Sequence, residues 1–100
     1  MFTLKIEHPI RDFAVWKAAF ERDPVGRKQA GVRRHRVFRP AGDPHYIVVD
    51  LDFDRAAEAE AFLEALRGVW SRAELSPGLA REGAAPPRTT IVEEVEHQDY

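Results

Sequence analysis

The 100-residue sequence predicts a single α+β domain with the element order β-α-β-β-α-β. Three observations lead to this prediction. Apolar and polar residues alternate near the start of the chain, apolar residues recur at helical spacing in two later segments, and two β-rich runs flank a turn rich in Pro, Gly and Asp. A chain of this length has room for one hydrophobic core and no second lobe.

The first strand is predicted over residues 2–8, where the strict alternation is typical of a strand with one covered face. Asp12 then stands where a helix N-cap is needed. The helix after it carries an aromatic stripe at i, i+3 and i+7, formed by Phe13, Trp16 and Phe20. This helix should end before Pro24, and a short, partly helical connector over residues 25–30 should lead to an end signal at Gly31.

The middle of the chain predicts a β-hairpin. Residues 31–39 and 45–53 are β-rich, and residues 40–44 read Pro-Ala-Gly-Asp-Pro. In the second run, the residues expected beneath the helices are Ile47, Val49, Leu51 and Phe53. The alternate residues, expected on the open face, are Tyr46, Val48, Asp50 and Asp52. In the first run, one set of alternate residues is Arg33, His35 and Val37, which corresponds to the covered face. The other set is Val32, Arg34, Arg36 and Phe38, which corresponds to the open face.

A second helix, capped by Asp54 and running as far as Leu75, is predicted from an i, i+3, i+4, i+7 pattern of Ala59, Phe62, Leu63, Leu66, Val69 and Trp70. Residues 76–87 are predicted to form a loop, and residues 88–96 the last strand. This order gives a four-stranded antiparallel sheet with two helices on one face, the ferredoxin-like arrangement. Right-handed crossovers place the first and third strands in the middle of the sheet.

The open face of the sheet predicts a homodimer. A short turn in the hairpin would set Arg34 or Arg36 across from Asp50, and apolar residues surround these charges. A surface that is neither fully polar nor fully apolar suits a partner sheet. The alternative is a solvated open face, which is common in antiparallel sheets.

Composition excludes several classes of protein. The formal net charge is −2, and the basic cluster at residues 33–36 is balanced by acids elsewhere, so binding to nucleic acid is not expected. No apolar run approaches the roughly 20 residues needed to cross a bilayer. The start of the chain lacks the apolar block of a signal peptide, and the chain contains no cysteine. These features predict a cytoplasmic protein with no membrane association.

The hairpin sequence GVRRHRVFRPAGDPHYIVVD of residues 31–50, and the helix after Phe53-Asp54, resemble the antibiotic-biosynthesis-monooxygenase-like group of dimeric α/β-barrel proteins. The resemblance covers essentially the whole chain and rests on architecture. It implies two sheets packed into a shared barrel, with a ligand cavity between sheet and helices in each subunit. Members of the group include cofactor-free oxygenases of aromatic polyketides, haem-degrading enzymes and quinol oxygenases, and small polyketide cyclases share the architecture.

One departure from this group concerns catalysis. The haem-degrading enzymes and the polyketide oxygenases use an asparagine near the pocket, and this chain contains none. Neither catalytic set can therefore be transferred to this sequence residue by residue.

On the register that the resemblance suggests, His35 shares the covered face with Arg33 and Val37. A histidine can move a proton to or from a bound phenol or quinol, and an arginine can stabilise an anionic oxygen. The simpler interpretation is a histidine hydrogen-bonded at the sheet edge and an arginine extended to water. The residues predicted to contact a substrate are Trp16, Phe20, Val37 and Trp70, and the simpler interpretation of the aromatic ones is core packing.

His8 and His45 are expected to lie near each other, but a metal site would need a third ligand, so no metal is predicted. The sequence leaves three functions open. The first is a dimer that binds a hydrophobic or aromatic small molecule and oxidises it without a cofactor, the second is a polyketide cyclase, and the third is a non-catalytic ligand-binding or dimerisation protein.

Overall fold

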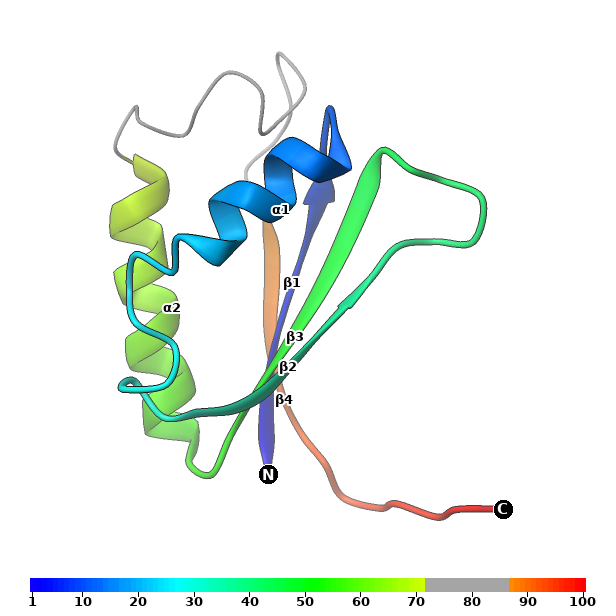
Figure 1. Cartoon of the computed structure of the whole chain (residues 1–100). Coiled ribbons are helices and arrows are strands. Elements are labelled where there is room, and N and C mark those ends of the chain that lie inside the picture. The colour runs from blue at the N-terminus through cyan, green and yellow to red at the C-terminus, as the bar shows by residue number, and fades with distance from the viewer. Residues whose placement is uncertain (72–86) are drawn as a thin grey trace.

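The computed structural model describes residues 1–71 and 87–100 and confirms the predicted order of elements. Both helices lie on the same side of the sheet (Figure 1). In the described part of the chain, no helix is long and apolar enough to span a membrane. The elements are β1 (Phe2–Pro9), α1 (Phe13–Glu21), β2 (Val32–Phe38), β3 (Tyr46–Phe53), α2 (Ala56–Ser71) and β4 (Arg88–Glu93).

The sheet is antiparallel throughout, with the order β2-β3-β1-β4. The first and third strands therefore occupy the middle, as predicted, and β2 and β4 are the edges. The last strand is shorter than predicted, ending at Glu93 instead of residue 96. Its final bond with β1 joins the Glu94 amide to the Met1 carbonyl (3.0 Å), so the pairing stops where β1 begins.

The two helix starts differ from each other. Asp12 is the N-cap of α1, as predicted, and its carboxylate accepts a hydrogen bond from the Val15 amide (3.2 Å). The prediction that Asp54 caps α2 is wrong. The first intrahelical bonds of α2 go to the Arg55 carbonyl, and the Glu58 carboxylate accepts the Arg55 amide (3.2 Å). The predicted extension of this helix to Leu75, and nearly all of the predicted loop, lie outside the described residues.

The core lies between the sheet and the helices, and the alternation of the β3 sequence explains it. Ile47, Val49, Leu51 and Phe53 are all buried beneath the helices, as predicted. Helix α2 packs closely on β1, β3 and β4, with the small residue Ala59 fully buried. Helix α1 reaches the core mainly through long aromatic side chains, of which Trp16 is 7% exposed.

A β-bulge in β2 changes one predicted facing. Val32 pairs with Phe53 and Arg34 with Asp52, so Arg33 is the extra residue between the two pairs. The prediction that Val32 lies on the open face with Arg34 is therefore wrong, and Val32 packs against the core. Beyond the bulge the predicted alternation holds, with His35 opposite Leu51 and Val37 opposite Val49.

The open face carries charged pairs that cross three strands. Arg36 lies opposite Asp50, as predicted, and the Asp50 carboxylate also contacts the Lys5 ammonium (3.0 Å). The carboxylate of Asp52 accepts hydrogen bonds from Arg34 Nε (2.5 Å) and Thr3 Oγ1 (2.6 Å). Burial alone would raise the pKa of Asp52, but these hydrogen bonds outweigh burial and hold that pKa below its usual value. Asp52 thus stays ionised although it is almost fully covered.

The connector between α1 and β2 ends at Gly31, and this glycine gives a testable prediction. Its φ is +101°, and an added Cβ would lie 2.6 Å from Glu58 Oε2. Gly31→Ala should lower the free energy of unfolding by about 1–3 kcal/mol through backbone strain and this close contact. Gly68→Ala is the control, because within residues 1–71 and 87–100 a Cβ there meets nothing within 4 Å, and alanine in place of glycine inside a helix should raise the free energy of unfolding by about 0.5–1 kcal/mol. Urea unfolding compares the two variants, and equal stabilities would contradict the prediction.

Candidate functional site

An open cleft of about 640 Å³, the β2 cleft, lies where the connector after α1 meets the start of β2. Its volume is within the range of small-molecule sites. Both residues predicted to be catalytic, His35 and Arg33, line it. The other lining residues are Asp23, Arg27, Lys28, Gly31, Val32 and Arg34.

Helix α1 supplies an aromatic wall behind His35. The Phe20 ring stacks on Trp16 with centroids 4.9 Å apart, and the His35 ring meets Phe20 edge to face at 5.1 Å. This contact follows from the alternation in β2, which turns His35 toward the helix side of the sheet. Because β2 is an edge strand, the His35 side chain also remains accessible to solvent.

Arg27 is held in place beside this wall. Its guanidinium lies over the Phe20 ring (4.0 Å to the centroid) and donates to the Phe20 carbonyl (2.9 Å). Asp23 contacts the same guanidinium (3.6 Å) and accepts a hydrogen bond from the Arg27 amide (2.8 Å). The guanidinium is thus ordered before any ligand arrives.

The environment of His35 favours its neutral form. Its pKa is lowered by partial burial first, and then by the positive charges of Arg27 and Lys17, against a smaller opposite effect of Asp23. At neutral pH the imidazole is therefore uncharged, which is the state that can accept a proton.

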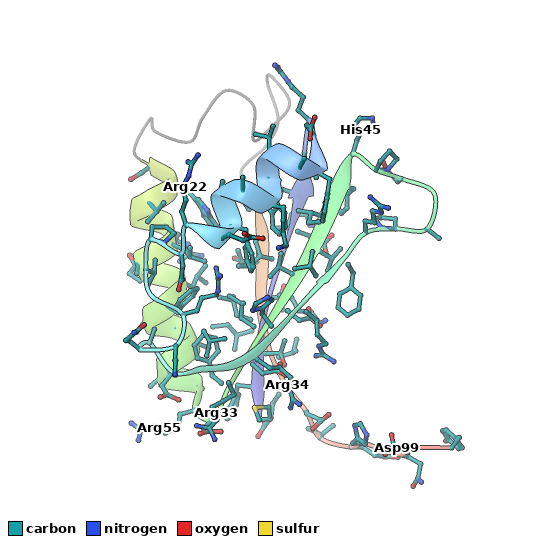
Figure 2. All side chains as sticks on the ribbon, in the orientation of Figure 1. Arg22, Arg33, Arg34, His45, Arg55 and Asp99 are labelled. Carbon is teal, nitrogen blue, oxygen red and sulfur yellow. The ribbon has the colours of Figure 1, made fainter. Side chains whose placement is uncertain are left out.

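Arg33 differs from the prediction in its surroundings. Its side chain is 63% exposed and lies 3.6 Å from the Asp54 carboxylate. The bulge leaves Arg33 without a partner in the β2–β3 register, and Arg33 is one of the residues that line the cleft. Figure 2 shows it near the start of β2. It lines the same cleft as His35 but is not enclosed beneath the helices.

The four predicted substrate contacts are only partly brought together. Phe20 touches His35 directly. Trp16 is buried behind Phe20, while Val37 and Trp70 are partly buried against the core. None of these four lines the cleft itself. The side chains that sequence reasoning missed are Arg27, Asp23 and Lys28, and the i, i+4 spacing of Asp23 and Arg27 was the available signal.

The histidines considered as metal ligands are engaged elsewhere. His8 Nδ1 lies 3.0 Å from the Pro9 carbonyl, and His45 Nδ1 lies 3.1 Å from the Arg11 carbonyl. Among residues 1–71 and 87–100, no three His, Cys, Asp or Glu side chains cluster closely enough to hold a metal ion.

Comparison with known proteins places the fold. No protein-family model and no curated protein sequence matches the chain. Among solved structures, it is similar to a "putative antibiotic biosynthesis monooxygenase" from Deinococcus radiodurans, with a TM-score of 0.60 and 14% sequence identity. The match covers 100% of this chain and 98% of the other. At this identity the likeness shows that the two chains share the ferredoxin-like fold.

Proposed function

We propose that the protein is a homodimer that binds an aromatic small molecule at the β2 cleft and oxidises it with O₂ without a cofactor. The observation that carries this proposal is that the accessible, neutral His35 imidazole lines the cleft beside the ordered Arg27 guanidinium, with the Phe20 ring packed directly behind the imidazole. The shared fold with a protein described as a "putative antibiotic biosynthesis monooxygenase" supports it.

In the proposed reaction, His35 removes a proton from an acidic CH₂ group or phenol of the substrate. Arg33, which lines the same cleft, stabilises the resulting anionic oxygen. The anion then reduces O₂. For a CH₂ flanked by aromatic rings, one oxygen atom is retained as a carbonyl, and the other leaves as water with the two hydrogens of the CH₂ group.

Two groups of side chains support the homodimer. Asp50 and Asp52 are only 5% and 3% exposed, although they lie on the face of the sheet opposite α1 and α2 (Figure 1). Around these charges the same face presents apolar side chains, including Phe38, which is 47% exposed. A second sheet of the same composition could cover the apolar residues and extend the charged rows.

A second function is favoured by the openness of the cleft. Trp16 and Trp70 pack in or against the core instead of closing the site, and His35 remains accessible to solvent. Such a site suits a protein that binds a ligand without turnover.

A polyketide cyclase is the remaining alternative. It would use the same imidazole for proton transfer and would consume no oxygen.

The test of the catalytic proposal is His35→Gln, assayed by oxygen uptake with an anthrone or a naphthoquinol. Loss of the general base should lower turnover by about 10²- to 10⁴-fold, while affinity changes little. His45→Gln is the matched control, because His45 is exposed and lies outside the cleft. Wild-type protein that binds these compounds without consuming oxygen would support the binding protein instead. Turnover that His35→Gln leaves unchanged would remove His35 from the mechanism.

A further inference from the structure

The lining of the β2 cleft has an excess of positive charge. Arg27, Lys28 and Arg33 contribute three cationic side chains, whereas Asp23 is the one acidic residue of the lining. Arg34 also lines the cleft, but its guanidinium pairs with Asp52 on the open face of the sheet. The chain as a whole is slightly acidic, so this excess is local and does not reflect overall composition.

The neighbouring acids neutralise this charge incompletely. Arg34 and Arg33 pair with Asp52 and Asp54, which are not lining residues. Arg27 is 3.6 Å from Asp23. Lys28 makes no ion pair with any residue in 1–71 or 87–100, so at least one lining cation is left without a carboxylate there.

We propose that the ligand of this cleft is an organic anion whose carboxylate binds between Lys28, Arg27 and His35. The inference rests on the proposed binding function and narrows it to a substrate class. The ordered Arg27 guanidinium and the exposed Lys28 ammonium suit a carboxylate, since charge-assisted hydrogen bonds are stronger than neutral ones. The cleft volume matches a small molecule, and the net charge of the chain argues against a polyanion such as nucleic acid.

Binding of an anion should be linked to the charge on His35. The charged groups that act on the imidazole are Arg27, Lys17 and Asp23, and the cleft adds Lys28 and Arg33, since the Arg34 guanidinium pairs with Asp52 on the open face. A carboxylate beside the ring favours the imidazolium and so raises the pKa of His35. Affinity should therefore increase as the pH falls through that pKa, until the ligand itself becomes protonated.

The experiment compares 2-naphthoate with its neutral isostere naphthalene-2-carboxamide, by calorimetry and by NMR titration of the His35 ring. The carboxylate should bind at least about tenfold more tightly, a difference of about 1.4 kcal/mol, and should raise the pKa of His35. Lys28→Glu should weaken naphthoate binding about tenfold or more. Arg22→Glu, an equal change of charge on a connector residue outside the cleft, should change it less than about threefold.

The outcomes separate this inference from the proposed function. If the amide binds as tightly as the carboxylate and perturbs the His35 resonances, the cleft is a ligand site but the inference of an anion is wrong. If naphthoate binds and no anthrone or quinol consumes oxygen, the anion site stands and the oxygenase proposal fails. Absence of binding by both compounds, or equal effects of the Lys28 and Arg22 variants, would overturn the inference.

Discussion

The double substitution Arg34→Glu with Arg36→Glu is expected to convert the proposed dimer to monomers and to destabilise each subunit. Asp50 and Asp52 are almost fully covered, and the two arginines supply much of their compensating charge. The substitution places acids beside both carboxylates and on the face proposed to meet a second copy. Because both arginines are half-exposed, we expect a loss of about 1–3 kcal/mol in the free energy of unfolding.

Light scattering at micromolar concentration measures the mass of the particle in solution and so distinguishes dimer from monomer. Chemical unfolding measures the free energy of unfolding of the variant and of the wild type. The matched control is Arg22→Glu with Arg55→Glu, which changes the net charge equally at exposed sites away from the open face, as Figure 2 shows. This control should remain dimeric. A monomeric wild-type protein, or an R34E/R36E variant that stays dimeric, would contradict the proposed interface.

Most of the fold could be predicted because its local signals agree with each other. The alternation in β3 fixes which residues are buried, and the Asp12 cap and the aromatic stripe define α1. The bulge at Arg33 could not be predicted, because a one-residue shift depends on how β2 meets β3 and leaves no mark in the local pattern. The same applies to Asp54, which precedes α2 at a plausible capping position but lies beside Arg33 instead.

The site was less predictable than the fold. Strand periodicity gave two possible facings for β2, and the register suggested by the family resemblance placed His35 on the helix side, where the structure has it opposite Leu51. Arg27 escaped notice because it lies in a connector of turns, and its position over Phe20 depends on the path of the chain between Asp23 and Gly31. Residues in such connectors carry no periodic signal, so their role emerges only from the tertiary structure.

Trp16→Ala is expected to lower the free energy of unfolding more than any other single substitution in α1. Trp16 is the one buried residue of this helix, at 7% exposure, and lies between Phe13 and Phe20 with centroid distances of 5.9 and 4.9 Å. Removing its side chain leaves a large cavity, and the free energy of unfolding should fall by about 3–5 kcal/mol. Thermal and urea unfolding measure this loss.

Trp70→Ala is the matched control, because Trp70 lies in the last described turn of α2 and is only partly buried. It should cost clearly less than Trp16→Ala, and equal losses would contradict the packing argument. Trp16→Phe should retain much of the stability, since a ring still fills the space.

The Trp16→Ala substitution should also weaken ligand binding at the cleft. The Phe20 ring stacks on Trp16 and also contacts the His35 ring and the Arg27 guanidinium, so the loss of Trp16 removes the support of both cleft residues. A folded Trp16→Ala protein with wild-type affinity for naphthoate would show that the cleft is formed independently of the aromatic stripe.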